Sequence, residues 1–413
     1  NGYPNHYSIR SPSEIYSYRI LEGGFKVIGR KMNQLFNEAL SIGVAALSKK
    51  VFSIKNFSKK ASPIEAYSIK AQKRKPNSNL SRNNNALPLR CKATFIFAML
   101  CIVFEIRTVS FTWAQAESPA IVDRYDQVFS REKNDKSLTA WFLRLLLSEE
   151  SNTDEKSGDS TIIISPDNKV MLIDGGAPSC GAMVCSYLHA LGIERIDAIV
   201  VSHPHIDHIG GLISVLQEFP VEVIYMSKLE YPTAIFQSFL TNAAEKEIPI
   251  IYLEEGSEFD LGSKIHAKVY NPEANIVYYT GYPANSTLFV NDRSLVIKFA
   301  FGNSSMLFMG DVYTSRELDL IEKYGSELKA DVLKVGHHGS DTSSSKSFIR
   351  LVSPEIAVIM HDRLASLQVY NNLRKIGAAV YLSPIDGNIR VSIDDEENMS
   401  VITQFDRISD FLK

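Results

Sequence analysis

The stretch Ile199-Val-Val-Ser-His-Pro-His-Ile-Asp-His-Ile-Gly-Gly211 says most about the fold of this chain. Within six positions, after an apolar run and before two glycines, it places four potential ligands: His203, His205, Asp207 and His208. Histidine and aspartate are costly to bury without partners. Imidazole nitrogens and a carboxylate together suit zinc or a similar first-row divalent ion. The cluster therefore predicts a metal site at the end of a buried strand.

The spacing of these residues divides them into two pairs. Side chains alternate along an extended chain, so His203 and His205 point the same way and are expected to hold one ion. Asp207 and His208 then lie around the following turn, where they are expected to hold a second ion. A polar loop with chance histidines is the alternative, but it leaves the four residues without a common partner.

The same stretch resembles the HxHxDH signature of the metallo-β-lactamase superfamily of metallohydrolases. Three further motifs stand in the expected order: Met171-Leu-Ile-Asp-Gly-Gly176, Leu307-Phe-Met-Gly-Asp311 and Ala330-Asp-Val-Leu-Lys-Val-Gly-His-His-Gly-Ser340. The His-His-Gly-Ser turn is most similar to the branch that contains the extracellular hydrolase domain of ComEC-type DNA-uptake proteins and the phosphorylcholine esterases. The resemblance covers residues 137–393.

From residue 137 onwards the chain alternates between strand and helix patterns. Apolar runs predict strands, of which the first four span 140–147, 160–164, 169–173 and 196–202. Apolar residues at helical spacing predict helices over 181–191 and 209–219. Residues 148–159 read as a charged loop. Strands mixed with covering helices indicate an α/β protein, and together with the resemblance they predict an αββα sandwich.

The resemblance implies a binuclear metal centre. In this assignment His203 and His205 hold the first metal. Asp207 and His208 hold the second, and Asp311 bridges both. Two divalent ions can share a bound water and lower its pKa to about 7, which supplies a hydroxide. Zinc is the first expectation and manganese the second. Asp311 has an alternative role as the N-cap of a helix predicted over 315–324, because Asp is a common cap.

Three other residues have expected roles around this centre. His337 and His338 are adjacent, so their side chains are expected to diverge and only one of them to ligate a given ion. The other is expected to donate a proton to the leaving group or to bind the substrate. Asp174 is expected to orient a ligand imidazole from outside the metal, with an ordinary turn aspartate as the alternative.

The chain departs from the family pattern in two places. Many members have another histidine ligand between the cluster and the bridging aspartate, but here that interval contains only His266, which we do not expect to ligate. Asn291 or Ser294 is expected to approach the site instead. His361 either replaces the histidine of a Tyr-Gly-His-Pro-type loop or is simply exposed. Ser340 either contacts substrate oxygens or caps the next helix.

Charge is distributed unevenly along the chain. Residues 1–92 carry 17 Lys and Arg against 4 Asp and Glu, whereas the remainder has a net charge of −16. The basic part is expected to be a disordered or partly helical extension. The acidic remainder disfavours generic binding of nucleic acid, whose affinity comes chiefly from Lys and Arg at phosphates.

An apolar stretch precedes the hydrolase-like region. Residues 93–104 (ATFIFAMLCIVF) are too short for a spanning helix, which needs about twenty residues. They do match the core of a signal peptide, followed by the small-x-small site Ala114-Gln-Ala116. We therefore expect a signal-like or membrane-anchor segment over 93–116, with membrane attachment through 93–113 as one outcome. A buried helix is the alternative.

That assignment sets the expected domain boundaries. The hydrolase domain is expected over 117–413, with translation beginning near Leu87 or Leu89 and the preceding residues being upstream read-through. Cys180 and Cys185 are expected to be buried free thiols, with a local disulfide as the alternative.

These observations predict an exported hydrolase, located outside the cytoplasm of a bacterium and either secreted or anchored. Its expected substrate is a phosphodiester. The acidic balance favours a small or lipid-derived substrate, and the family branch favours single-stranded nucleic acid. Hydrolysis of a carboxyl ester or lactone, and a metal-stabilised binding module without activity, are the other hypotheses. The sequence identifies no protein partner.

Overall fold

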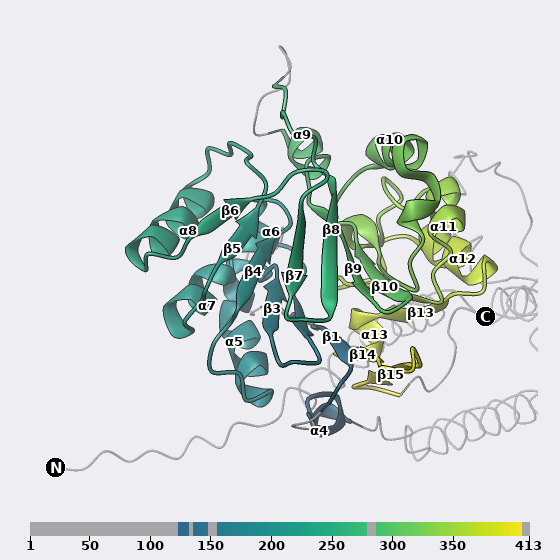
Figure 1. Cartoon of the computed structure of the whole chain (residues 1–413), viewed down its shortest axis with the longest axis horizontal. Helices are drawn as coiled ribbons and strands as arrows, with labels where there is room; N and C mark the ends of the chain where they lie inside the picture. The colour runs from purple at the N-terminus through teal and green to yellow at the C-terminus, as the bar shows by residue number, and fades with distance from the viewer. Residues whose placement is uncertain (1–122, 132–134, 148–154, 279–285, 407–413) are drawn as a thin grey trace, which may run out of the picture. The chain divides into compact units, whose positions relative to one another are not determined.

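The structure is a computed structural model that describes residues 123–131, 135–147, 155–278 and 286–406 (Figure 1). The basic extension predicted over 1–92 and the apolar segment predicted over 93–116 lie outside these residues. Within the described ranges, no helix is both long enough and apolar enough to cross a membrane.

Two β-sheets form the centre of the fold (Figure 1). The first has eight strands in the order β15-β14-β1-β2-β3-β4-β5-β6. They are β1 (Leu138–Phe142), β2 (Thr161–Ile164), β3 (Val170–Ile173), β4 (Ala198–Val201), β5 (Ile224–Met226), β6 (Ile250–Tyr252), β14 (Ile389–Ile393) and β15 (Met399–Thr403). The neighbours from β3 to β6 pair in parallel, and the other pairs are antiparallel.

The second sheet has seven strands in the order β13-β12-β11-β10-β9-β8-β7. They are β7 (Glu258–Leu261), β8 (Ile265–Asn271), β9 (Val296–Phe301), β10 (Ser304–Phe308), β11 (Val332–Lys334), β12 (Ile356–Ile359) and β13 (Ala379–Leu382). Strands β10 to β13 pair in parallel, so their carboxyl ends meet at one edge of the sheet.

Helices cover the outer face of each sheet (Figure 1). Those on the first sheet are α5 (Gly181–Ala190), α7 (Leu212–Glu218) and α8 (Ala234–Glu245). Those on the second are α10 (Thr314–Tyr324), α11 (Lys346–Val352) and α12 (Leu367–Lys375). The short helices are α4 (Tyr125–Val128), α6 (Ile206–Ile209), α9 (Thr287–Asn291) and α13 (Ser383–Asp386).

Most of the buried apolar residues form three layers that follow this arrangement. Strand β4 illustrates them, because both of its faces are buried, as in most parallel sheets. Ala198 and Val200 belong to the core between the sheets, whereas Ile199 and Val201 pack under the helices. Across the central layer, the rings of Phe142 and Phe308 stack at 6.0 Å. The predicted αββα sandwich is confirmed.

Two predicted elements have different bounds. The strand predicted over 140–147 ends at Phe142, and the rest of its apolar run packs beside the first sheet in its helix-side core. The helix predicted over 209–219 is divided into α6 and α7 at Gly210 and Gly211. A Cβ at Gly211 would lie 2.0 Å from the carbonyl oxygen of Gly175, so this close contact requires glycine. Cys180 and Cys185 are buried free thiols, as predicted.

Candidate metal centre

The predicted ligands come from both sheets. His203 to His208 follow strand β4 of the first sheet, and Asp311 follows β10 of the second. His337 and His338 follow β11, which pairs in parallel with β10. Because each group lies just beyond the carboxyl end of its strand, the topology gathers residues distant in sequence at one edge of the sandwich.

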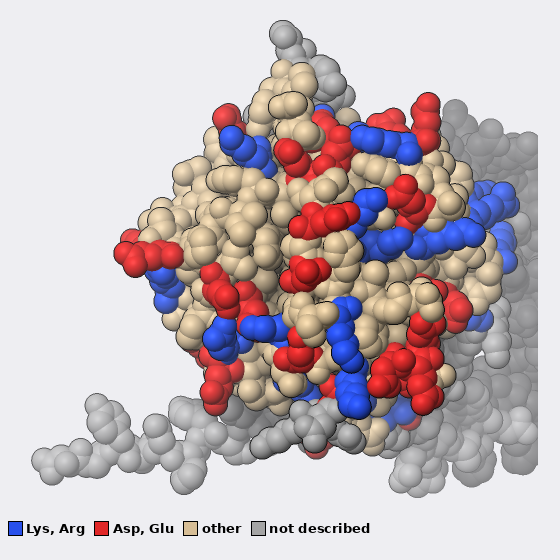
Figure 2. Space-filling view, viewed as in Figure 1, with Lys and Arg blue, Asp and Glu red and all other residues tan. Residues whose placement is uncertain are grey.

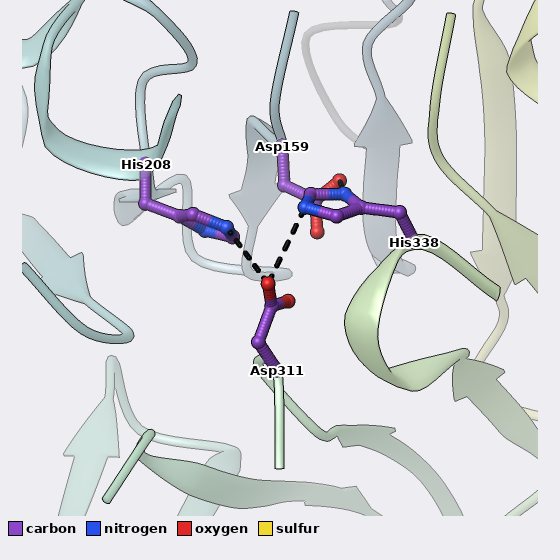
Figure 3. Close-up of side chains that lie close together, drawn as sticks. All are labelled: Asp159, His208, Asp311 and His338. Carbon is purple, nitrogen blue, oxygen red and sulfur yellow. Dashed lines mark hydrogen bonds and ion pairs between the residues drawn. The ribbon is translucent and has the colours of Figure 1, made fainter. Parts of the chain in front are cut away.

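The carboxylate of Asp311 lies at the centre of this group (Figure 3). Its Oδ2 lies within ion-pair distance of four imidazole Nε2 atoms: His203 at 3.9 Å, His208 at 3.4 Å, His337 at 3.9 Å and His338 at 3.3 Å. Helix α10 begins at Thr314 after the N-cap Tyr313, so Asp311 does not cap it. The helix-capping alternative is wrong.

The imidazole rings of His203 and His205 also lie close together. The Nε2 of His203 lies 2.9 Å from the Nδ1 of His205. Burial lowers the pKa of both histidines, that of His205 to about 4, so both are neutral at pH 7. Two neutral ring nitrogens that face each other at this distance can share a cation, to which each offers a lone pair.

Asp174 and Ser202 fix the orientation of two of these rings. Asp174 accepts hydrogen bonds from the Ser202 hydroxyl at 2.6 Å and from its amide at 2.8 Å. Because the Ser202 hydroxyl donates its proton to Asp174, its Oγ accepts a hydrogen bond from the Nδ1 of His203 at 3.0 Å. Asp174 also lies 2.8 Å from the Nδ1 of His208. The Nε2 of each ring is then the atom that faces Asp311, at 3.9 Å for His203 and 3.4 Å for His208.

The side chains of His337 and His338 converge, so the expectation that they diverge is wrong. Both residues have left-handed backbone conformations, with φ of 47° and 54°. Such conformations are uncommon for residues other than glycine and often occur at functional sites. They turn both Nε2 atoms towards Asp311. The Nε2 of His338 also lies 3.5 Å from Asp207.

Asp159 is a site residue that the sequence analysis missed (Figure 3). Its Oδ1 lies 3.0 Å from the Nδ1 of His338, and its Oδ2 lies 2.5 Å from the ammonium of Lys334. The segment predicted as a charged loop thus ends inside the protein, where Asp159 is buried. The sequence signal was Gly158 before an acidic residue at the start of a strand.

The electrostatics of the site favour bound cations. Four carboxylates, those of Asp159, Asp174, Asp207 and Asp311, surround the histidines. Burial disfavours the charge of Asp207 and Asp311, but the neighbouring histidines outweigh this effect and hold the pKa of each carboxyl below its usual range. The ammonium of Lys334 is paired with Asp159.

Several buried atoms fit a divalent metal. The Nε2 atoms of His208 and His338 and the Oδ1 of Asp311 have no hydrogen-bond partner, although buried polar atoms normally have one. One atom each from Asp159, His208, Asp311 and His338 lies within 4.8 Å of the others. Because Lys334 and His338 already engage both oxygens of Asp159, this residue supports a ligand and the remaining three face the metal position.

The turn expected to replace the missing histidine lies behind Asp311. Ser294 is fully buried, and its hydroxyl accepts a hydrogen bond from the Asp311 amide at 3.0 Å. Asn291 is buried, and its Oδ1 has no partner. His266 is exposed on β8 and pairs with Asp260 at 3.0 Å, away from the site.

Of the remaining predicted residues, Ser340 lies next to His337 and His361 next to His338. The hydroxyl of Thr342 lies 2.7 Å from the Nδ1 of His337 and 3.0 Å from the hydroxyl of Ser340. Ser340 therefore supports His337, while Ser345 caps α11. The ring of His361 lies edge-on to that of His338, with centroids 5.3 Å apart, and its side chain is only 9% exposed. His361 thus lies beside the site.

Comparison with known proteins identifies the family of this chain. Residues 153–361, half of the chain, match the family model of the Metallo-beta-lactamase superfamily. The chain belongs to this superfamily, whose fold and buried His/Asp cluster define a metal-dependent hydrolase.

The curated relatives confirm the predicted resemblance to ComEC-like proteins. Competence protein ComA of Neisseria gonorrhoeae is 30% identical over 199 residues, which are 48% of this chain and 25% of ComA. ComE operon protein 3 of Bacillus subtilis is 30% identical over 173 residues, which are 42% of this chain and 21% of that protein. The match thus spans a quarter or less of these relatives.

One of the solved structures that this chain matches is also from Bacillus subtilis. The metallo-beta-lactamase fold protein YhfI from Bacillus subtilis has a TM-score of 0.38 at 15% identity, covering 60% of this chain and 96% of YhfI.

Proposed function

We propose that this hydrolase cleaves phosphodiesters with the help of two divalent ions. The observation that carries the proposal is the convergence of four histidine Nε2 atoms on one oxygen of Asp311, at 3.3 to 3.9 Å. Such a constellation offers more ligands than one tetrahedral ion needs. Zinc is the first candidate and manganese the second.

The ligands divide into two sets that share Asp311. His203 and His205, whose facing nitrogens are 2.9 Å apart, hold one ion. Asp207, His208 and His338 hold the other; His338 belongs here because its Nε2 faces both Asp207 and Asp311. Bound divalent ions supply Lewis acidity at this position and lower the pKa of water to about 7.

His337 and His361 are left to act on the substrate. The Nδ1 of His337 is engaged by Thr342, and that of His361 by Asp362 and two backbone amides. Each ring therefore has its Nε2 available. We assign His337 to donate a proton to the leaving oxygen and His361 to bind a phosphoryl oxygen, with Asn291 as a further substrate contact.

The substrate is inferred from the relatives and from charge. The similarity to competence protein ComA and to the ComEC-like branch favours single-stranded nucleic acid. Basic and acidic side chains are interspersed on the face drawn in Figure 2, and the chain after residue 92 has a net charge of −16. Polyanion binding depends on Lys and Arg at phosphates, so a short strand or a small phosphodiester suits this surface better than a long duplex.

The test uses the purified full chain. Metal analysis is expected to find about two equivalents of zinc or manganese, and the protein is expected to hydrolyse bis(4-nitrophenyl) phosphate and a single-stranded oligonucleotide. Cleavage of the chromogenic ester alone would identify a small or lipid-derived substrate. Hydrolysis of an aryl carboxyl ester without either phosphodiesterase activity would overturn the substrate class.

We also propose an extracytoplasmic location. The support is the signal-like pattern at 93–116, and residues 117–413 are the proposed mature hydrolase domain. Mass spectrometry of the protein expressed in a bacterial host is expected to find a mature N-terminus near Glu117 if the segment is cleaved. Retention in the membrane with residues 93–113 intact would instead indicate an anchor.

A further inference from the structure

Lys334 occupies a position where the fold calls for an apolar side chain. On β11, Val332 faces the core between the sheets and Leu333 faces the core under the helices. Alternation along the strand returns Lys334 to the central core, where its register partners are Phe308 and Val358. Its side chain is only 4% exposed. A charged side chain in such a core is costly unless it is paired.

The partner of Lys334 comes from the opposite sheet. Asp159 precedes β2 of the first sheet, and its Oδ2 lies 2.5 Å from the Lys334 ammonium. The ammonium also donates to the carbonyl of Val335 at 3.0 Å. The other oxygen of Asp159 lies 3.0 Å from the Nδ1 of His338. Lys334, Asp159 and His338 therefore form one continuous chain of contacts that ends at Asp311.

We infer that Lys334 is a positioning residue for the metal centre. Lys334 holds Asp159, and Asp159 in turn fixes the ring of His338. The inference rests on the metal-binding part of the proposed function. Because Lys334 engages one oxygen of the Asp159 carboxylate, only the other oxygen is available to the imidazole of His338. Asp159 then holds the Nδ1 side of the ring, and the Nε2 faces Asp207 and Asp311.

A purely structural ion pair is the competing account. Replacing a buried ion pair by apolar residues of similar volume is often neutral or stabilising, whereas removing one partner alone leaves an uncompensated charge. Asp159→Leu/Lys334→Met is such a replacement. The two accounts therefore agree that the double variant folds, and they differ in whether it binds metal normally.

The experiment compares the full-length wild type with Lys334→Met, Lys334→Arg and the double variant. Zinc affinity is measured by competition with a chromogenic chelator, and thermal unfolding is followed on the metal-free proteins. We expect Lys334→Met and the double variant to bind zinc about 10- to 100-fold more weakly, the usual effect of losing a group that orients a ligand. The double variant is expected to unfold at or above the wild-type temperature.

Lys334→Arg tests for rescue by a retained charge. A cavity of about 20 Å³ beside Lys334 gives the larger guanidinium some room, and we expect zinc affinity within a few-fold of the wild type. Lys298→Met is the matched control, because Lys298 lies on β9 of the same sheet and contacts the carbonyl of Glu327 outside the site. Its zinc affinity is expected to be unchanged.

The results separate three conclusions. Wild-type zinc affinity in the double variant would overturn the inference and leave a structural ion pair. Equal weakening in Lys334→Arg and Lys334→Met would also overturn it, because charge would not matter. If Lys334→Met does not fold, Asp159→Asn replaces it, with the same expected loss of affinity and the same contrary result. Absence of zinc binding by the wild type would instead refute the proposed function.

Discussion

His208 follows a strand of the first sheet and Asp311 a strand of the second, yet the Nε2 of His208 lies 3.4 Å from the Oδ2 of Asp311. The candidate metal centre therefore joins the two halves of the sandwich at their common edge. A ligand that binds only the folded protein stabilises it by mass action, by about 2.7 kcal/mol when its free concentration is a hundred times its Kd. This relationship connects metal binding with the stability of the whole fold.

Removal of metal is accordingly expected to destabilise the protein. Treatment with a strong chelator should lower the Tm by several degrees, and added zinc or manganese should restore it. Differential scanning calorimetry measures the shift. His266→Ala, which removes an exposed histidine away from the site, should show the same shift as the wild type. An identical Tm with and without chelator would contradict a metal that links the sheets.

Gly158 is expected to be indispensable to the site. Its φ is +75°, and a Cβ there would lie 1.6 Å from the carbonyl oxygen of Asp207. Gly158→Ala should therefore displace either Asp159 or the ligand loop, lowering the free energy of unfolding by about 3 kcal/mol and reducing metal content. Chemical denaturation and metal analysis measure the two effects.

Gly192→Ala is the matched control for that variant. Gly192 also has a positive φ, of +66°, but no atom lies within 4 Å of its added Cβ. Only backbone strain remains, so the cost should be about 1 kcal/mol with full metal content. Equal effects of the two substitutions would show that the contact with Asp207 does not matter.

His361→Ala distinguishes a substrate contact from a bystander. The ring lies beside His338 but does not face Asp311, so the variant should keep its metals. If His361 binds the substrate, the rate of phosphodiester hydrolysis should fall by about 10²-fold or more. His189→Ala, at an exposed position on α5, provides the control. A wild-type rate in His361→Ala would exclude His361 from the reaction.

The two described cysteines should be protected from alkylation in the native protein. Burial raises the pKa of Cys180 to about 11 and that of Cys185 to about 12. At pH 8.5 both thiols stay protonated when folded, whereas unfolded thiols begin to ionise. Because the folded pKa is the higher one, this contribution to stability is complete below about pH 9 and is lost as the pH rises through 11 to 12.

Peptide mapping by mass spectrometry after iodoacetamide treatment measures this protection at each cysteine. Little modification of Cys180 and Cys185 is expected in the native protein at pH 8.5, and complete modification in denaturant. Rapid native alkylation of either residue would contradict its burial.

The sequence predicted the parts of the site that are concentrated in one stretch or that follow an apolar strand. His203 to His208 share a short segment, and Asp311 follows the run that becomes β10. Their positions relative to a strand end determine where the fold brings them. The αββα architecture was predictable for a similar reason, because buried strands and amphipathic helices leave clear periodic patterns.

Asp159 and Lys334 were harder to predict because each is a single charged residue, and the two are 175 positions apart. A lysine within the apolar pattern of β11 was a local signal, since such exceptions often mark functional sites. The convergence of His337 and His338 depends on two left-handed residues, which the spacing of an adjacent pair does not reveal. Helix α8 was missed although Thr233 caps it and its apolar residues have helical spacing.

Replacement of Asp311 tests the central claim most directly. The measurement is the metal content of the purified full chain together with its hydrolysis of bis(4-nitrophenyl) phosphate, with Asp319→Ala on the exposed face of α10 as the control. Asp311→Ala should lose at least one metal equivalent and all measurable turnover, because the shared anionic ligand is gone. Full metal content and full activity in Asp311→Ala would contradict the account of a metal centre built around this carboxylate.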